Sequence, residues 1–564
     1  MSTARRTLFV LVAWCLCAFG CGPQDAKPGL DLSVPQTQTD LPVIVPDTSG
    51  GAFTVTVQGK ITFQKLHLLD DAGNVISRTA TIEPLRLVDV EAHDASGALV
   101  STQVGTDDTG VFSLAVQART AYTLVVKSST TANGGRFNVE VRDPTSPFPL
   151  YAIVIGQDAA GTPFPAANAG AVVTLTIDPL PSLTVPAGST FRPGAVANIL
   201  DAAFNASEAQ RLATGLTLPK LTYFWSPASK VGSFFNEPAS IFVLGGNSDT
   251  DDTDEFDDSV IEHEFGHFLV FSISRDVSLG GSHAFDDVLY PTLAYSEGMA
   301  DWWSCAARKV PVEIDSQGIT GNAVQFFSVQ FESTGTQAFA RGRESEATVA
   351  ELLWDLADGT EGRPSTDADP VALTLLQMIT ALKNLRNTVS YLVIDDFLQA
   401  LIDSGAVART TIDALILQPE DQKFTFAGAD AFPTPIVRGG PFLQDTVRTV
   451  LPAPLGSHTG IDRANRFFKF DLPSVTNNVS LSVQLSNVAG TDATGTNVDL
   501  ILLDANNTAL AQSAGQTNFE SILVPSLPAG RYYINVSGRP NPFANNDQQT
   551  NTSEQTVSFT IGLQ

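Results

Sequence analysis

The segment Val260-Ile261-Glu262-His263-Glu264-Phe265-Gly266-His267-Phe268-Leu269-Val270-Phe271 combines a helical apolar pattern with two histidines four residues apart. On a helix these histidines stand one turn above each other, so His263 and His267 can direct both imidazoles at one metal, with Glu264 beside it. Two neutral nitrogens suit zinc, and the chain has only 6 histidines in total. The alternative is a chance match to HExxH, and the surrounding apolar residues, which are typical of a buried helix, argue against it.

A second segment, Tyr295-Ser296-Glu297-Gly298-Met299-Ala300-Asp301, offers a third ligand. A catalytic zinc needs three protein ligands and one open position for water. If a helix begins here, Glu297 and Asp301 share a face, so Glu297 can bind zinc while Asp301 orients a ligating histidine through its free ring nitrogen. The alternative is that both acids merely favour a helix N-terminus.

These two motifs resemble those of the gluzincin metallopeptidases. The 29 residues between His267 and Glu297 are closer to the spacing of fungalysin than to that of thermolysin. Residues 347–356 are similar to a helix that follows the third ligand in fungalysin-like enzymes. The resemblance implies an α+β zincin-like domain, bound Zn²⁺ and endopeptidase activity on proteins or peptides. In the expected mechanism Glu264 is not a ligand; it takes a proton from the attacking water and returns it to the leaving amine.

The group that stabilises the oxyanion is not evident from the sequence. Thermolysin-like enzymes use a histidine downstream of the third ligand, but after Glu297 only His458 remains, far along the chain. A donor is nevertheless required where negative charge develops. The candidates are His283, Tyr290, Arg341 and Arg343, although each of these alone is more often a surface or structural residue.

The motifs lie in a block predicted to span residues 187–440, where the apolar period is close to 3.6. Within this block, Ile241-Phe242-Val243-Leu244-Gly245 is interpreted either as an edge strand that an extended substrate joins or as a plain core strand. The segments expected to be helical are 196–213, 256–272, 296–308, 347–356 and 371–385.

Residues 52–186 alternate apolar and polar side chains in short runs, which predicts a β-sandwich. The runs from Pro84 to Val90, from Thr106 to Phe112 and from Tyr122 to Val126 resemble the carboxypeptidase regulatory-like domain. Such modules are usually accessory, so His67 and His93 are interpreted as strand residues without a chemical role.

Residues 441–564 return to a strand pattern. Three strings, Arg466–Leu472, Asn497–Asp504 and Leu527–Val536, occur in the order found in the bacterial pre-peptidase C-terminal domain, which they resemble. That resemblance implies a small β-sandwich appended to a secreted peptidase.

The first 21 residues are typical of an export signal, with Arg5 and Arg6 preceding an apolar stretch that is too short to span a bilayer. Ala18-Phe19-Gly20-Cys21 resembles a bacterial lipoprotein cleavage box, which predicts lipidation of Cys21; an ordinary secretory signal is the alternative. Residues 22–51 are interpreted as a solvated tether. We therefore expect an exported protein, either an outer-membrane or cell-surface lipoprotein or a secreted one. The remaining cysteine, Cys305, is interpreted as an inert buried thiol.

A net charge of -28 argues against nucleic acid and against an anionic membrane surface as partners, which leaves the lipid anchor as the expected membrane contact. The acidic run before the HExxH helix allows Ca²⁺ but lacks the spacing of a recognised calcium loop, and a solvated negative loop is the favoured interpretation. Its members are Asp249, Asp251, Asp252, Asp254, Glu255, Asp257 and Asp258.

The sequence therefore predicts a multidomain protein in which a zinc metalloendopeptidase domain is flanked by two β-sandwiches. One alternative is a surface binding or adhesion lipoprotein whose peptidase-like block is inactive, although retention of Glu264 argues against it. Another is a zinc hydrolase that acts on a non-peptide amide. Substrate preference and oligomeric state do not follow from the sequence.

Overall fold

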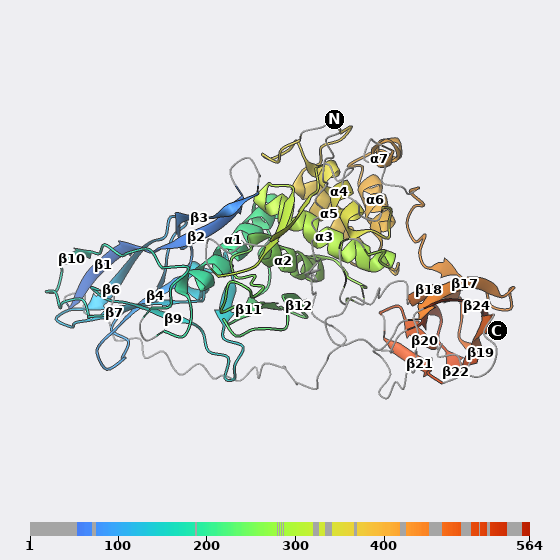
Figure 1. The fold of residues 1–564 in the computed structure, drawn as a ribbon, viewed down its shortest axis with the longest axis horizontal. Coiled ribbons are helices and arrows are strands. Elements are labelled where there is room, and N and C mark those ends of the chain that lie inside the picture. The colour runs from blue at the N-terminus through green and yellow to red at the C-terminus, as the bar shows by residue number, and fades with distance from the viewer. Residues whose placement is uncertain are drawn as a thin grey trace, which may run out of the picture.

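The computed structural model describes residues 53–564 except 70–74, 159, 187–188, 279, 281–282, 284, 286, 320–325, 333–340, 366–368, 418–424, 450–464, 487–497, 507, 516–518 and 539–554. The predicted signal, Cys21, the tether and His458 lie outside the described residues. Within them, the chain forms an elongated arrangement rich in β-sheet, with N-terminal strands at one end, helices in the middle and C-terminal strands at the other end (Figure 1). No described helix is both long and apolar enough to cross a bilayer.

The N-terminal part contains two sheets and a hairpin. Burial alternates along its strands, for example in Val111–Gln117, because successive side chains point to opposite faces. One sheet has the order β10 (Val172–Thr174), β1 (Thr54–Lys60), β6 (Val111–Gln117). The other has the order β5 (Val104–Gly105), β4 (Asp89–His93), β7 (Thr123–Lys127), β9 (Ala152–Ile155), and the hairpin joins β2 (Thr62–Leu69) to β3 (Val75–Pro84).

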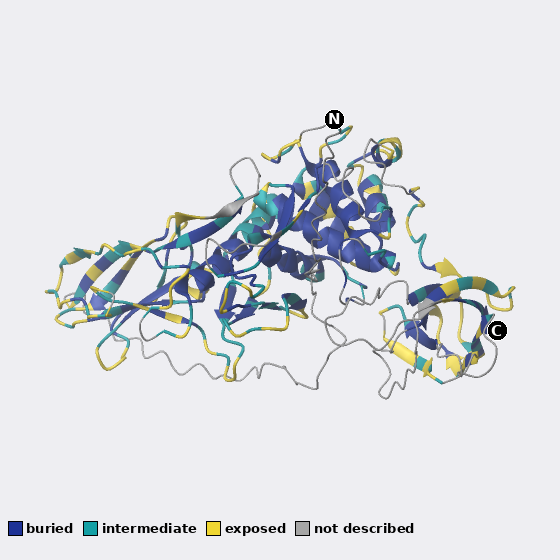
Figure 2. Cartoon of the chain, in the orientation of Figure 1, coloured by how far each residue is buried: buried dark blue, intermediate teal, exposed yellow. Residues whose placement is uncertain are grey.

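The central part contains the helices, and every segment predicted to be helical overlaps one. The segment 371–385 becomes helical only at Leu375, because the side chains of Thr374 and Gln377 form a capping box there. The helices are α1 (Pro193–Thr214), α2 (Asp258–Ile273), α3 (Pro291–Arg308), α4 (Glu346–Ala357), α5 (Leu375–Leu385), α6 (Ile394–Asp403) and α7 (Arg409–Ile416). Helices α2, α3 and α4 are buried along almost their whole length (Figure 2).

A four-stranded sheet lies beside the helices in the order β12 (Phe234–Asn236), β13 (Ser240–Val243), β11 (Leu221–Trp225), β8 (Val139–Arg142). Strand β13, which comes from the Ile241–Gly245 segment, pairs on both sides and is therefore a core strand. The edge strands are β12 and β8, and β12 is the edge next to β13. The two phenylalanines of β12 were not singled out in the sequence.

The structure joins the first two blocks more closely than a boundary at residue 186 implies. Strand β8 belongs by sequence to the predicted 52–186 unit, yet it pairs in parallel with β11 of the central sheet. The buried Lys65 on β2 also forms ion pairs with Asp201 at 2.8 Å and with Asp258 at 2.7 Å, at the start of α2. The N-terminal module therefore supports the helices that carry the motifs.

The C-terminal part forms two sheets around its own apolar core. Aromatic rings connect it to the helices: Phe467 lies 4.7 Å from Tyr290 and 5.1 Å from Tyr391, and Tyr533 lies 4.4 Å from Tyr391, all between ring centroids. One sheet has the order β16 (Thr434–Pro435), β18 (Asn465–Leu472), β23 (Gly530–Ser537), β20 (Asp499–Asp504), β21 (Ala509–Ser513). The other has the order β17 (Leu443–Thr449), β24 (Gln555–Leu563), β19 (Thr476–Ser486), β22 (Phe519–Leu527). The remaining described strands, β14 (Val312–Ser316) and β15 (Phe326–Gln330), form a hairpin-like pair in the central part.

Candidate metal centre

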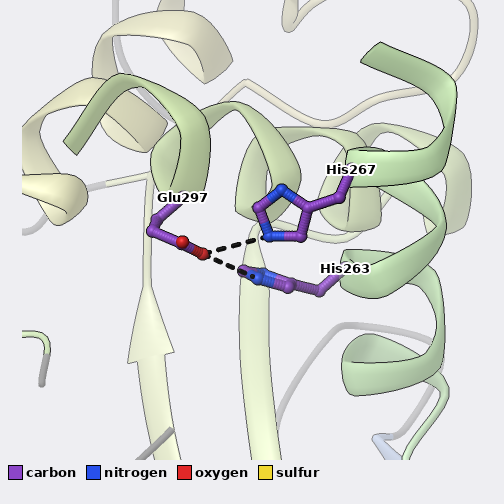
Figure 3. A group of neighbouring side chains, drawn as sticks. All are labelled: His263, His267 and Glu297. Atoms are coloured by element: carbon purple, nitrogen blue, oxygen red, sulfur yellow. Dashed lines mark hydrogen bonds and ion pairs between the residues drawn. The ribbon is translucent and has the colours of Figure 1, made fainter. Parts of the chain in front are cut away.

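Helices α2 and α3 bring the three predicted metal ligands together. His263 and His267 project from successive turns of α2, and Glu297 faces them from α3 (Figure 3). The Oε2 atom of Glu297 lies 3.3 Å from Nε2 of His263 and 3.1 Å from Nε2 of His267. One potential ligand atom from each residue lies within 4.8 Å of the other two, and all three side chains are buried. Two imidazole nitrogens and a carboxylate at this separation fit a divalent zinc-class ion.

Further side chains contact Nδ1 of both histidines and so orient their rings. Asp301, one turn beyond Glu297, has its Oδ1 atom 2.7 Å from Nδ1 of His263. Ser296 Oγ lies 3.4 Å from Nδ1 of His267, and the same hydroxyl donates to Oδ2 of Asp276 at 2.6 Å. Sequence reasoning identified Asp301 but missed Ser296 and Asp276. The adjacency of Ser296 to Glu297 was an available signal, whereas Asp276 had none.

Two glycines allow the helices to approach closely enough for this geometry. A Cβ atom at Gly266, inside the HExxH motif, would lie 2.8 Å from Cα of Ala300 on α3. A Cβ atom at Gly298, next to Glu297, would lie 2.7 Å from the carbonyl oxygen of Glu346 on α4. Both separations are shorter than van der Waals contact, so any larger residue at either position pushes the helices apart.

Electrostatic interactions keep Glu297 ionised although it is buried. Burial opposes its ionisation, but the charges of His267 and His283 and hydrogen bonds from the ligating histidines hold its pKa well below the usual value. The reverse holds for His267: burial lowers its pKa, but Glu297 outweighs burial and raises it. An ionised carboxylate that faces two imidazoles is a set of ligands suited to binding a cation.

Glu264 lies on the open side of this group. Together with His267 and Glu297 it lines a cavity whose apolar wall is formed by Phe234 and Phe235 of β12 and by Phe271. Its carboxylate accepts a hydrogen bond from the backbone of Phe235, and burial raises its pKa. Its Oε2 atom has no hydrogen-bond partner among the described residues. A buried carboxylate with a free oxygen at a cavity wall is suited to exchanging a proton with a bound molecule.

Of the four candidates for the oxyanion donor, His283 alone lies beside the ligands. Its Nε2 atom lies 3.9 Å from Oε2 of Glu297 and 3.2 Å from Oε2 of Glu346. Glu346 begins α4 and was not singled out in the sequence.

The other three candidates have other partners in the structure. Tyr290 precedes α3 and packs against Phe467. Arg341 pairs with Glu351, and Arg343 pairs with Asp395. The interpretation of Cys305 as a buried free thiol is confirmed, and burial raises its pKa.

Comparison with known proteins identifies one part of the chain. Residues 464–538 match the family of the bacterial pre-peptidase C-terminal domain, which confirms that prediction. The crystal structure of the pre-peptidase C-terminal domain of collagenase from Bacillus anthracis is 12% identical and covers 24% of this chain and 98% of that domain, with a TM-score of 0.15. A β-glucosidase from Paenibacillus barengoltzii is 8% identical and covers 90% of this chain and 70% of its own, with a TM-score of 0.09. No curated protein matches.

With TM-scores this low, neither structure supports a conclusion about the fold of this chain. The family match to residues 464–538 does identify the C-terminal domain. The domain is typical of secreted bacterial proteases, and it supports an exported, peptidase-associated protein.

Proposed function

We propose that this protein is an exported zinc-dependent metalloendopeptidase of the gluzincin type. The observation that carries the proposal is the convergence of His263, His267 and Glu297 on one point, with Glu264 at the wall of the adjoining cavity. The pre-peptidase C-terminal domain supports it independently, because that domain accompanies secreted proteases.

The ligand set leaves clear roles for the surrounding residues. When bound, zinc would supply Lewis-acid polarisation of the scissile carbonyl and of the attacking water. Glu264 accepts the proton of that water and delivers it to the leaving amine. Asp301 and Ser296 orient the imidazoles of His263 and His267 so that Nε2 of each faces Glu297, and these three residues would hold the ion.

In this proposal the substrate binds as an extended peptide. Strand β12 is one edge of the central sheet and contributes Phe234 and Phe235 to the cavity wall. A peptide that pairs with this edge passes Glu264, and the apolar wall accepts an apolar side chain of the substrate. In this proposal His283 donates to the developing oxyanion, because it is the only candidate donor beside the ligands among the described residues.

The remaining domains have accessory roles in the proposal. The N-terminal unit acts as a carboxypeptidase regulatory-like module, and Cys21 anchors the protein through lipid. The net charge of -28 favours protein substrates over nucleic acids.

The test uses the chain from residue 22 onward, compared with Glu264→Gln. We expect about one zinc per chain in both proteins and cleavage of casein only by the wild type. As a matched pair, His263→Ala should lose zinc, whereas His67→Ala should keep it, because His67 bonds to Thr81 on the β2–β3 hairpin. Zinc binding without cleavage of casein would favour the binding-protein alternative. Absence of zinc from the wild type would refute the ligand assignment.

A further inference from the structure

A second group of carboxylates lies outside the candidate metal centre. Asp252 and Asp254, in the loop before α2, meet Asp315 on β14, and one carboxylate oxygen from each lies within 4.8 Å of the others. The interpretation of the acidic run as a solvated loop is therefore wrong for much of it, since Asp254, Glu255 and Asp257 are buried.

The backbone holds this loop against the end of β14. Asp252 forms a β-bridge with Gln317, and the backbone N–H of Gly318 donates to the carbonyl of Asp251 at 2.9 Å. The hydroxyl of Thr253 donates to the carbonyl of Gly318 at 3.3 Å. The three carboxylates are thus brought together by fixed backbone rather than by mobile side chains.

Neighbouring acids in the same run have partners that offset their charge. Glu255 pairs with the buried Arg192. Asp257 accepts from the backbone N–H of Ser316 at 2.7 Å, and Asp251 pairs with Lys230 at 3.1 Å. Each of these charges is accounted for without a ligand.

Asp252 and Asp254 have weaker compensation: the charge of Lys230 lowers the pKa of Asp252 only in part, and burial still raises it. Neither forms an ion pair with a lysine or arginine among the described residues, and the Oδ1 atom of each is buried without a hydrogen-bond partner there. Asp254 is only 5% exposed, and its other oxygen accepts from Ser233. A buried carboxylate oxygen without a donor is costly unless a cation or a proton is present.

The pKa shifts agree with this geometry. Burial raises the pKa of Asp252, and burial together with the charges of Asp252 and Asp257 raises the pKa of Asp254 well above its usual value. Asp252 also hydrogen-bonds the side chain of Asp315, which two carboxylates do only if they share a proton.

We infer that Asp252, Asp254 and Asp315 bind a structural divalent cation of the calcium class. All the donors are carboxylate oxygens, which hard cations prefer, and the group lacks the nitrogen and sulfur atoms that select zinc or copper. Asp252 is only partly buried, so it provides access and room for water ligands. The inference does not depend on the proposed peptidase activity.

Such an ion would hold in place the N-terminal end of the helix that carries His263 and His267. Ser259 in the first turn of α2 accepts from the backbone N–H of Ile314 at 3.1 Å, so β14 and α2 are already connected. A cation joining Asp315 to Asp252 and Asp254 fastens the preceding loop to the same strand. Binding of the ion should therefore stabilise α2 against unfolding.

The experiment uses the chain from residue 22 onward with Glu264→Gln, which prevents self-cleavage, loaded with zinc. Ca²⁺ is added by equilibrium dialysis, and metal content and the thermal midpoint are measured. We expect one Ca²⁺ per chain and a higher midpoint, with zinc content unchanged. Absence of bound Ca²⁺, or binding without any rise in the midpoint, would overturn the inference.

Variants locate the site. Asp254→Asn keeps the shape of the side chain and should weaken Ca²⁺ binding about 100-fold. Asp252→Asn provides a second test if Asp254→Asn does not fold. The control Asp251→Asn removes a charge from the same loop but outside the group, so Ca²⁺ should still bind. Unchanged Ca²⁺ affinity in folded Asp254→Asn or Asp252→Asn would place the ion elsewhere and contradict the assignment. Because zinc content is measured in every sample, failure of this site is distinguishable from failure of the metal centre.

Discussion

The Oδ1 atom of Asp301 lies 2.7 Å from Nδ1 of His263, while Nε2 of the same ring faces Glu297. The carboxylate therefore fixes which nitrogen of His263 is presented to a metal. We expect Asp301→Asn to lower zinc affinity about 10-fold to 100-fold, measured by competition with a chromophoric chelator. The control His67→Ala should bind zinc as the wild type does. Equal affinities of Asp301→Asn and wild type would show that this contact does not orient the ligand.

Because His283 lies beside Glu297 but is not one of the proposed ligands, its substitution should impair catalysis without removing the metal. His283→Ala should lower kcat about 100-fold to 1000-fold, as loss of an oxyanion donor does, while zinc content stays near one per chain. Tyr290→Phe serves as the control, because Tyr290 packs against Phe467, and its kcat should match that of the wild type. Loss of zinc from His283→Ala would instead assign His283 to the ligand set.

Gly266 tests whether the close approach of α2 and α3 is required. In an isolated helix Gly→Ala stabilises by about 1 kcal/mol. Here the added Cβ would lie 2.8 Å from Cα of Ala300, and overpacking of this kind costs about 1–3 kcal/mol, so the clash should prevail. We expect Gly266→Ala to lower the thermal midpoint and weaken zinc binding.

Gly105→Ala is the matched control for that substitution. Its Cβ would have no neighbour closer than 3.5 Å, so the midpoint should be nearly unchanged. A midpoint for Gly266→Ala equal to or above that of the wild type would mean that the helices have space between them.

Asp396 on α6 predicts a pH dependence of stability. Burial raises its pKa from 3.8 to about 6, even though its carboxylate accepts from the backbone N–H groups of Val393 and Asp430. Because the folded state binds this proton more tightly than the unfolded state, Asp396 contributes most below pH 4, and its contribution falls as pH rises to about 6. The two-unit shift corresponds to about 3 kcal/mol.

Asp396→Asn cannot titrate and should remove this dependence. Thermal midpoints of both proteins are measured from pH 4 to pH 7. As the pH rises, the midpoint of the wild type should fall relative to that of Asp396→Asn, and the difference between the two should become constant above pH 6. Parallel curves for the two proteins over this range would contradict the expected protonation of Asp396.

Local patterns in the sequence predicted the elements that carry the site. The 3.6-residue apolar period and four-residue spacings specified α2, α3 and the shared faces of His263 with His267 and of Glu297 with Asp301, because those relationships depend only on helix geometry. The alternating strings around Arg466–Leu472 likewise predicted the C-terminal β domain, which the family match at residues 464–538 confirms.

Tertiary structure alone determined how these elements meet. The contact of Gly266 with Ala300, the Ser296–Asp276 pair behind His267, the position of His283 between Glu297 and Glu346, and the pairing of β8 with β11 all join segments far apart in the chain. The same is true of Asp315, whose carboxylate meets those of Asp252 and Asp254 although it lies about 60 residues further along the chain. A local pattern records which face of an element is apolar, but the partner of that face is selected by packing of the whole chain, so no single segment reveals it.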